Sequence, residues 1–328
     1  MSKRVLVTGG AGFIGRESVR KLVTSGYEVV CFDLAEQIAR HRPYLDKIAT
    51  LGKLRLVPGS VLDRNAVRQA VNGVEVVLHL AAMLGVKKTE DNKLSCIEIN
   101  INGTDNVLSA AVSHGVRKFI FASSSEVYGE PNRNPILETD DTKGKTVYAV
   151  TKLAGEELVK GYHQLYPSLD YTIIRFFNTY GEGQVAQFVL CKFVREVLAG
   201  RNPVVYGDGN QVRSYGHVGD VTDGVRRIIE NPVSNGQVYN LGNSSQVMTL
   251  RELAQRVIDL VSPDKGLRVE VLGGFAGSDR VSEREIHVRY CDTSHAKTDL
   301  GFEPRITVDE GIRRIAAQEV IHADWPSC

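Results

Sequence analysis

The sequence predicts an α/β fold in which helices cover both faces of a doubly wound parallel sheet, joined to a smaller mixed α/β lobe. Two observations predict this class. Short Val- and Ile-rich runs, apolar on both faces, alternate with helical patterns from residue 3 to residue 178. A glycine-rich turn joins the first run to the first helical pattern, as in sheets that bind a ligand beyond the carboxyl ends of their strands.

The elements alternate regularly as far as residue 178. Each expected strand is a short apolar run, and each expected helix places apolar residues three and four positions apart. We expect strands at 3–9, 27–33, 54–60, 74–82, 118–124 and 171–178. We expect helices at 14–26, 63–73, 100–114 and 148–165, with a polar helical stretch between the second and third strands.

The pattern changes after Asn178. A helical run at 187–200 leads into a turn-rich stretch at 202–216, and 236–242 resembles a strand that returns to the sheet. Thr249 and Glu252 form a capping-box signature at the start of a further helix.

This change suggests two regions. We assign 1–177 to the sheet domain, with later strands near 216–245 and 286–292 returning to it, and 178–328 mainly to the lobe. Open α/β sheets bind ligands beyond the carboxyl ends of their strands, so the lobe is expected to close over that edge.

Composition excludes several classes of partner. The 40 Lys and Arg residues are balanced by 39 Asp and Glu residues, so we expect no basic surface for nucleic acid and no polybasic membrane anchor. The longest apolar stretches have the length of strands, and the N-terminus enters a strand without a signal-type apolar segment. We therefore expect a soluble, cytoplasmic protein.

Cysteine usage agrees with this expectation. The five cysteines are odd in number and form no CxxC pair. Several lie in apolar runs, such as Cys31 in VVCFDL, which is typical of reduced, buried thiols. We expect neither a disulfide framework nor a metal site.

A phosphate-binding turn is predicted near the N-terminus. Gly9, Gly12 and Gly15 permit a tight turn, a close approach of the backbone to a pyrophosphate, and close packing of helix on strand. Asp33 ends the second strand at the spacing of a carboxylate that binds ribose hydroxyls. Asp33 would repel a 2′-phosphate, which favours NAD over NADP, although Arg40 and Arg42 are near enough in sequence to bind such a group.

Tyr148 and Lys152 are spaced i, i+4 and so share one face of a predicted helix. Lowering a tyrosine pKa from about 10 to neutrality takes about 4 kcal/mol. A cation about 4 Å away at an effective dielectric near 20 supplies about that much. Lys152, helped by a positive nicotinamide ring, is therefore adequate to hold Tyr148 as phenolate. An isolated pair of this kind is also typical of an ordinary surface helix.

The pair is not isolated. GxxGxxG at 9–15, HLAA at 79–82, NINGT at 100–104, SSSEVYG at 123–129, YAVTK at 148–152, RFFN at 175–178 and RSYGHVGD at 213–220 occur in this order. The series resembles the extended short-chain dehydrogenase/reductase family, and within it the nucleotide-sugar epimerases, dehydratases and decarboxylases. The resemblance covers essentially the whole chain and implies a Rossmann-like NAD-binding domain with a substrate-binding lobe.

The resemblance implies a set of NAD contacts. The glycine turn would hold the pyrophosphate and Asp33 the adenosine ribose. The family's usual GDxxD segment reads GSVLD at 59–63, so Val61 and Asp63 become the candidates near adenine. The implied set is Gly9, Gly12, Phe13, Ile14, Gly15, Asp33, Val61, Asp63, Leu80, Ala81, Ala82, Asn100, Tyr148 and Lys152.

The resemblance also implies roles at the sugar. Ser124 would hydrogen-bond the sugar O4, and Tyr148 would take the O4 proton as hydride leaves C4 for NAD. Asn178 would contact the diphosphate, and Tyr206 would pack near the base.

Two arginines would pair with the phosphates. Arg213 is the first by resemblance. The second normally lies in an RPGD segment, which is replaced here by SERE at 282–285, so the role falls to Arg280 or Arg284, and we favour Arg280.

Glu126 decides the type of reaction. Once C4 is a ketone the C5 proton is acidic, and a carboxylate near C5 is suited to remove it. In the resembling proteins, 4,6-dehydratases and uronate decarboxylases carry Glu here, whereas many 4-epimerases carry a small or neutral residue. Ser125 stands where one dehydratase subtype has an acidic Asp, which argues against that subtype. The alternative, evenly balanced, is a Glu126 that only hydrogen-bonds substrate hydroxyls or packs toward solvent.

The sequence thus favours an NAD-dependent enzyme that acts on a nucleotide-diphosphate sugar through a transient 4-keto intermediate. Among these substrates, a UDP-sugar is favoured. A UDP-hexose or UDP-hexuronate 4-epimerase is favoured. A 4,6-dehydratase or UDP-glucuronate decarboxylase that uses Glu126 is the alternative, and a non-catalytic NAD-binding scaffold is the alternative from another class.

Similar enzymes form homodimers through a four-helix bundle. The helices around 102–114 and 148–165 carry apolar residues that we expect to contribute to such an interface. These residues are Val107, Leu108, Ala111, Leu153, Leu158 and Tyr162.

Overall fold

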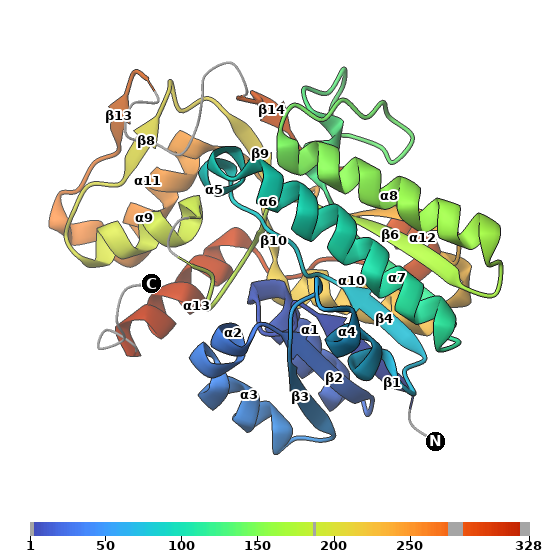
Figure 1. The fold of residues 1–328 in the computed structure, drawn as a ribbon. Coiled ribbons are helices and arrows are strands. Elements are labelled where there is room, and N and C mark those ends of the chain that lie inside the picture. Colours follow the sequence, from blue (N-terminus) through green and yellow to red (C-terminus); the bar gives the residue numbers. More distant parts are fainter. Residues whose placement is uncertain (1–2, 186–187, 275–284, 322–328) are drawn as a thin grey trace.

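A seven-stranded parallel sheet forms the centre of the molecule (Figure 1), and the computed structural model describes residues 3–185, 188–274 and 285–321. The strands are β1 (Arg4–Thr8), β2 (Glu28–Asp33), β3 (Leu54–Pro58), β4 (Val76–His79), β5 (Lys118–Ser124), β6 (Asp170–Phe176) and β11 (Gln237–Leu241). Their order is β11-β6-β5-β4-β1-β2-β3, and every neighbouring pair is parallel. The chain therefore starts in the middle, winds to one edge and returns to the other, which confirms the doubly wound sheet.

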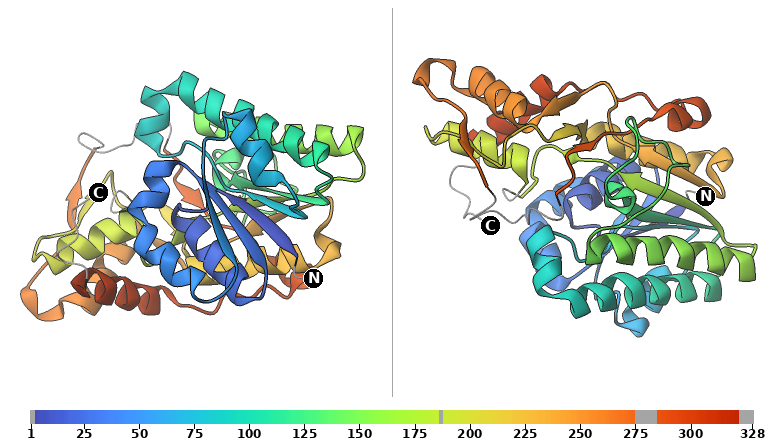
Figure 2. Two further views of the ribbon diagram at one scale, coloured as in Figure 1. Left: turned by 60° about the horizontal axis from the view of Figure 1, so that its bottom comes forward. Right: turned by 90° about the horizontal axis from the view of Figure 1, so that it is seen from above.

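Helices cover both faces of this sheet. One face carries α4 (Arg64–Val71), α7 (Gly103–Ser113) and α8 (Val147–Leu165), and α7 and α8 lie side by side in both Figure 1 and Figure 2. The other carries α1 (Phe13–Thr24), α3 (Arg42–Ala49), α10 (Val218–Glu230) and α12 (Ser294–Leu300). α2 (Ala35–Arg40) follows β2, and α5 (Val86–Asp91) and α6 (Lys93–Ile97) lie between β4 and α7.

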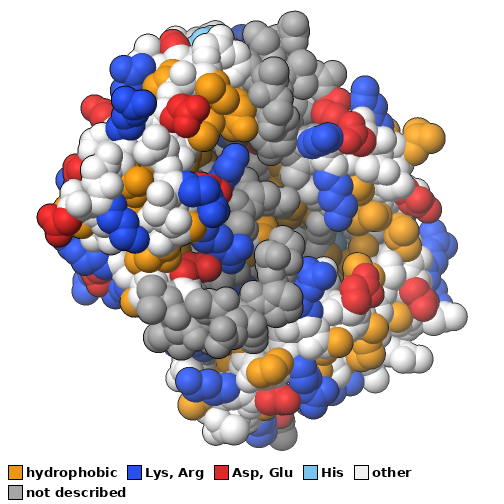
Figure 3. Space-filling model, turned by 90° about the vertical axis from the view of Figure 1, so that its left-hand side faces the viewer, with side chains coloured by type: hydrophobic (Ala, Val, Ile, Leu, Met, Phe, Trp, Pro, Cys, Tyr) orange, Lys and Arg blue, Asp and Glu red, His pale blue; other side chains and the backbone are white. Residues whose placement is uncertain are grey.

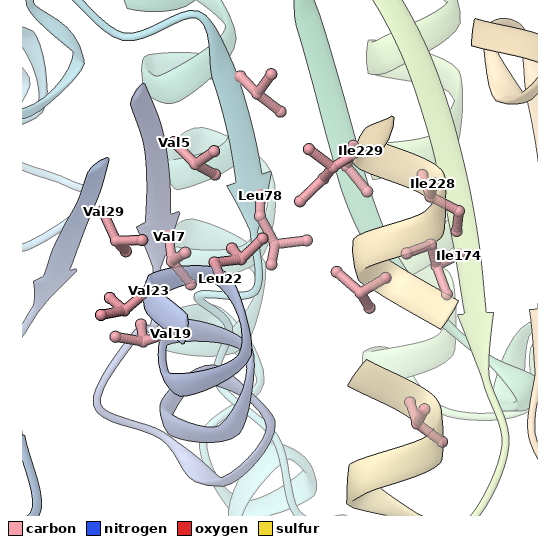
Figure 4. Packing of buried hydrophobic residues seen from close by; sticks show 14 of the residues in the cluster. Val5, Val7, Val19, Leu22, Val23, Val29, Leu78, Ile174, Ile228 and Ile229 are labelled. Atoms are coloured by element: carbon pink, nitrogen blue, oxygen red, sulfur yellow. The ribbon is translucent and has the colours of Figure 1, made fainter. Parts of the chain in front are cut away.

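The two faces have separate apolar cores. In Figure 4, Val5 and Val7 of β1 point toward Leu22 of α1, and Ile228 and Ile229 of α10 extend the same layer. These five side chains are at most 4% exposed. A strand buried on both faces needs apolar residues at consecutive positions, which is why the strands are continuous Val- and Ile-rich runs.

The lobe has its own core between α9 (Val189–Leu198), α11 (Leu250–Val261) and α13 (Val308–Ile321). Short strands flank it: β8 (Val204–Tyr206) pairs with β13 (Glu270–Leu272), and β9 (Val212–Ser214) lies between β12 (Val247–Thr249) and β14 (Val288–Arg289). The capping box predicted at Thr249 and Glu252 is present at the start of α11.

Two expectations about strands and helices need correction. The strand near 286–292 does not return to the main sheet, because β14 pairs with β9 instead. Val107, Leu108 and Ala111 do not form an outer face of α7, because all three are fully buried against the sheet.

Four cysteines fall in the described part of the chain: Cys31, Cys96, Cys191 and Cys291 are buried free thiols. Among the described residues, no helix combines the length and the apolar composition that a membrane crossing requires.

Candidate active site

The glycine turn between β1 and α1 has the geometry of a phosphate cradle. Gly9 has a φ of +68°, and a Cβ at this position would lie 2.8 Å from the Ala81 backbone nitrogen. A Cβ at Gly15 would collide with the Gly9 carbonyl. Gly12 is the N-cap of α1 and has no side chain to cap the helix. The backbone amides of the first turn, from Phe13 and Ile14 onward, therefore point out of the N-terminus of the helix, where an anion binds. The turn therefore fits a pyrophosphate.

Asp33 lies at the carboxyl end of β2, next to this turn. Its Oδ2 accepts the Ala11 amide at 2.9 Å and its Oδ1 accepts the Leu34 amide at 2.8 Å. Burial raises the pKa of Asp33, and the backbone donors oppose that rise. Each oxygen keeps a lone pair for a ribose hydroxyl, so the carboxylate fits the role that the sequence predicts.

The two residues predicted near adenine already have structural roles. Asp63 is the N-cap of α4, and its Oδ1 accepts the amides of Asn65 and Ala66 at 2.9 and 3.1 Å. Val61 is buried, and its carbonyl accepts a hydrogen bond from Asn106. An adenine contact by either residue stays a prediction.

The loop after β4, which includes Leu80, Ala81 and Ala82, is fixed by Asn100. The side-chain amide of Asn100 accepts from the Met83 amide at 2.7 Å and donates to the Met83 carbonyl at 3.1 Å and to Thr151 at 3.0 Å. Asn100 lies in a π-helical turn (Glu98–Asn102) and is 2% exposed. Its side chain therefore holds the loop against α8, and a direct contact of Asn100 with the cofactor stays a prediction.

A buried chain of hydrogen bonds holds the end of β4, where the same loop begins. Thr104 donates to the Asn100 carbonyl at 2.6 Å, so its oxygen accepts from Nε2 of His79 at 3.0 Å. Nδ1 of His79 then accepts from Thr8 at 2.7 Å. Burial lowers the pKa of His79 to about 3, so the ring is neutral.

Tyr148 and Lys152 share one face of α8, as their spacing predicts, and Ser124 ends β5 beside them. The Lys152 ammonium donates to the Ala122 carbonyl at 2.7 Å and lies 5.7 Å from the centre of the Tyr148 ring. Burial lowers the pKa of Lys152 to about 8.

In the protein alone, the surroundings of the Tyr148 hydroxyl shift its pKa upward. Burial raises this pKa, the Glu126 carboxylate raises it further, and a hydrogen bond with Ser124 lowers it. The expected phenolate depends on Lys152 together with a positive nicotinamide ring, and this combination stays a prediction. Desolvation and the neighbouring carboxylate oppose it, and neither can be read from the spacing of residues.

Glu126 points to the same place as Tyr148. Its Oε2 accepts from the Thr146 hydroxyl at 3.3 Å, and its Oε1 lies 3.8 Å from Nη2 of Arg289. The Glu126 amide donates to the Ser124 hydroxyl at 3.2 Å. The carboxylate is therefore tied to the site from α8 and from β14, and it does not simply face solvent. Arg289 is only 5% exposed.

A second ion pair anchors α8 from behind. Glu156, one turn after Lys152, receives two hydrogen bonds from Arg175 of β6, at 2.9 and 2.7 Å. The Ser123 hydroxyl also donates to it at 2.5 Å. Both charged residues are at most 6% exposed. This pair fixes the helix that carries Tyr148 on the strands below it.

Ser125 is 3% exposed in a 3-10 turn (Ser125–Tyr128). It has neither the acidity nor the exposure of a proton donor.

The lobe carries the residues predicted for the nucleotide. Asn178 follows β6, and its carbonyl accepts the Gly216 amide at 3.1 Å. Tyr206 ends β8, and the Lys192 ammonium lies over its ring. The surface is hollowed near the centre of the face in Figure 3, and Lys and Arg side chains gather beside the hollow.

The guanidinium of Arg213 holds protein groups. It donates to Glu285 at 3.0 Å and to the carbonyls of Ile286 at 2.6 Å and His287 at 3.1 Å. A phosphate contact by Arg213 stays a prediction. Arg280 and Arg284, the two candidates for the second phosphate arginine, lie outside the described residues.

Two residues of the site were missed in the sequence. Arg289 lies in a two-residue strand without any local motif, and the long-range contacts of this segment with β9 and with Ile136 bring it to Glu126. Thr146 carries a local signal, since a Thr just before a helical pattern is typical of an N-cap. Its contact with Glu126 is not readable from spacing.

Comparisons with known proteins extend these observations. A family model described as "NAD dependent epimerase/dehydratase family" matches residues 5–242. A UDP-N-acetyl-alpha-D-glucosaminuronate decarboxylase of Bacillus cytotoxicus is 35% identical over 95% of this chain and 96% of its own length. A putative UDP-glucose 4-epimerase of Methanocaldococcus jannaschii is 32% identical over 95% of this chain and 96% of its own length.

A solved structure is similar in fold over nearly the whole chain. MoeE5 in complex with UDP-glucuronic acid and NAD matches with a TM-score of 0.84 and 30% sequence identity, over 97% of this chain and 99% of that one.

Proposed function

Because the chain belongs to the NAD-dependent epimerase/dehydratase family, we propose that it decarboxylates a UDP-hexuronate through a transient 4-keto sugar. One observation carries the proposal: the Arg289 guanidinium lies 3.8 Å from the Glu126 carboxylate, in the site that contains Tyr148. An arginine there suits a substrate with a carboxylate at C6, because guanidinium and carboxylate match in charge and geometry. A neutral hexose has no carboxylate at C6 to match the guanidinium in this way.

The side chains of the site act at two positions of the sugar, C4 with its oxygen O4 and C5. The glycine turn and Asp33 would hold NAD, which would supply reversible hydride exchange with C4. Tyr148 takes the O4 proton, and the Ser124 hydroxyl hydrogen-bonds the oxygen on which the ketone forms. Lys152 stabilises the charge on Tyr148. At the end of the turnover Tyr148 gives the proton back to O4.

Loss of CO2 follows from the 4-keto group. The C5–C6 bond breaks, and its electron pair becomes an enolate over C4 and C5 while C6 leaves as CO2. A proton then adds to C5. Glu126 is placed to pass this proton from solvent, so the net reaction consumes one proton and keeps the redox state of the cofactor.

Glu126 also favours decarboxylation over retention of the carboxylate. A substrate carboxylate held at Arg289 lies close to the like charge of Glu126, which raises the energy of the bound acid. Breaking the C5–C6 bond moves that negative charge to O4, near Tyr148, Ser124 and Lys152. The relief of repulsion therefore acts in the step that loses CO2.

A 4-epimerase of the same substrate class is the second candidate, supported by the relationship to the putative 4-epimerase of M. jannaschii. In such an enzyme Arg289 would hold the C6 carboxylate while the 4-keto sugar turns its other face to the cofactor. Dehydration has less support, because Ser125 is buried and is a poor acid.

The mass of the product separates these activities. The purified protein is incubated with UDP-glucuronate, UDP-N-acetylglucosaminuronate, UDP-glucose, UDP-N-acetylglucosamine and GDP-mannose, and products are analysed by mass spectrometry. We expect a loss of CO2 from one of the two hexuronates. An unchanged mass with a changed sugar would establish the epimerase, and a loss of water the dehydratase.

The role of the ion pair is tested with the active hexuronate. We expect Arg289→Lys to raise KM for it by about tenfold or more, as for a lost bidentate contact. Tyr148→Phe should abolish turnover and serves as the inactive control. Full activity of Arg289→Lys, with unchanged KM, would contradict the assignment of the C6 carboxylate to Arg289.

A further inference from the structure

Thr146 forms a link between Glu126 and the helix of Tyr148. It is the N-cap of α8, with an extended backbone, and its Oγ1 accepts the Ala149 amide at 3.1 Å. The same oxygen donates its one proton to Oε2 of Glu126 at 3.3 Å. An ionised carboxylate only accepts hydrogen bonds, so the direction of this bond is fixed.

The two oxygens of Glu126 have different partners. Oε2 faces Thr146 and Oε1 faces Arg289 at 3.8 Å. The contact with Arg289 is too long for a hydrogen bond and sets no orientation by itself. The Thr146 hydroxyl is therefore the directional contact to this carboxylate that the structure describes.

Thr146 stands two residues before Tyr148 at the start of the same helix. Movement of the first turn of α8 relative to Glu126 would change the separation between the phenol and the carboxylate. Those two groups must act on O4 and C5, two atoms of one sugar that are both bonded to C4. A single hydroxyl that binds both the helix and the carboxylate fixes this separation.

We propose that Thr146 is a positioning residue for Glu126, which sets the carboxylate at C5 while Tyr148 acts at O4. The inference rests on the proposed function, because it assigns Glu126 to the step after the ketone forms. It predicts that loss of the hydroxyl harms the second step and spares the first.

The helix start does not depend on Thr146 alone. Oε1 of Glu90 accepts the Val147 amide at 3.3 Å, so the first turn keeps one acceptor when the hydroxyl is removed. We therefore expect Thr146→Val to fold. Thr146→Ser keeps both hydrogen bonds and is the conservative variant.

Thr249 offers a matched control. It caps α11 in the lobe with the same side-chain geometry, and its hydroxyl accepts the Glu252 amide at 3.1 Å. Thr249→Val therefore removes a helix cap of the same kind without touching Glu126.

The test separates the two steps in single turnovers with the active hexuronate. Appearance of NADH absorbance reports hydride transfer, and product formation with uptake of deuterium from D2O at C5 reports the second step. For Thr146→Val we expect product formation to slow by about 10- to 100-fold, the worth of a hydrogen bond to a charged group. NADH should appear at nearly the wild-type rate and then persist, and Thr146→Ser should restore product formation.

Equal slowing of both steps in Thr146→Val, or slowing of neither, would overturn the proposal. So would a similar defect in Thr249→Val. A crystal structure of Thr146→Val provides a readout that does not depend on the reaction. An unmoved Glu126 carboxylate would refute the positioning role even if the substrate panel supports decarboxylation, and a displaced carboxylate would uphold it even if the panel gives another activity.

Discussion

The charge on Glu126 acts in opposite directions on the two halves of the proposed reaction. The carboxylate raises the pKa of Tyr148, in the same direction as burial of the phenol. A higher pKa leaves less phenolate to take the O4 proton. The residue that the second step requires therefore slows the first.

We predict that Glu126→Gln accelerates the first step several-fold at pH 7. Loss of the charge lowers the pKa of Tyr148, so more of the base is ionised. NADH absorbance in single turnovers measures this step, and product formation in the same sample should fall by about tenfold or more. Glu157→Gln is the control, because Glu157 is exposed on the same helix and pairs only with Lys160 among the contacts described. A slower first step in Glu126→Gln would contradict the prediction.

His79 contributes stability that depends on pH. Its pKa is lowered by burial to about 3, whereas a histidine in an unfolded chain titrates near 6.5. Below about pH 6.5 the unfolded chain therefore binds a proton that the folded chain does not. The contribution of His79 is present above that pH and is lost as the pH falls toward 3, at about 1.4 kcal/mol per unit.

His79→Gln removes this titration and keeps a side chain that both donates and accepts. We expect the wild type to lose about 2 kcal/mol more than His79→Gln between pH 7 and pH 5. Urea unfolding at the two pH values measures the free energies of unfolding. Equal losses in the two proteins would show that the ring does not titrate as inferred.

Residues with local spacing could be predicted from the sequence, and residues brought in from afar could not. The glycine turn, Asp33 and the Tyr148–Lys152 pair follow from short-range geometry. Arg289 reaches Glu126 through contacts of its segment with β9 and with Ile136, both of which are distant from it in sequence. The pKa of Tyr148 depends on desolvation, which the sequence does not contain.

At the level of elements, α8 packs closely on β5 at one glycine. A Cβ at Gly155 would collide with the Phe121 ring, whereas a Cβ at Gly161, on the same helix, would meet nothing within 4 Å. Substitutions at these two glycines therefore test the packing of α8 on β5 separately from the intrinsic stability of the helix.

We predict opposite effects for alanine at these glycines. Gly155→Ala should lower the free energy of unfolding by about 1–3 kcal/mol through overpacking. Gly161→Ala should raise it by roughly 0.5–1 kcal/mol, because alanine favours the helix. Chemical denaturation checks both, and destabilisation by Gly161→Ala would mean that this position is also packed, for example against another chain.

The same level shows where pattern reading fails. The apolar residues of α7 are expected from the sequence at a dimer interface. An apolar stripe at helical spacing normally faces the core, and Val107 and Leu108 do so. The main strands were predictable because they are long apolar runs. β14, with two residues, carries no pattern of its own.

For the whole molecule, exposed apolar side chains gather near the start of α8. Leu94 is 81% and Ile97 42% exposed on α6, which packs on α8, where Val150 is 54% exposed. Large apolar side chains exposed together are typical of an interaction surface. This surface lies beside the helices on which the sequence predicts a dimer.

We predict that the protein is a homodimer that buries this surface. Leu94→Arg should shift the mass measured by light scattering at micromolar concentration toward the monomer. Leu51→Arg is the control, because Leu51 is 54% exposed after α3, on another part of the molecule. A monomeric wild type would refute the dimer.

The place of β11 in the sheet has a consequence for synthesis of the chain. β11 pairs with β6, yet residues 177–236 separate them in sequence. While the ribosome adds those residues, β6 presents an open edge of unpaired main-chain groups flanked by the apolar Ile173 and Ile174, which invites pairing with another nascent chain. We expect a chain that ends at residue 178 to keep that edge and to aggregate. The nascent protein therefore needs protection from aggregation, for example by a chaperone, until β11 has emerged from the ribosome.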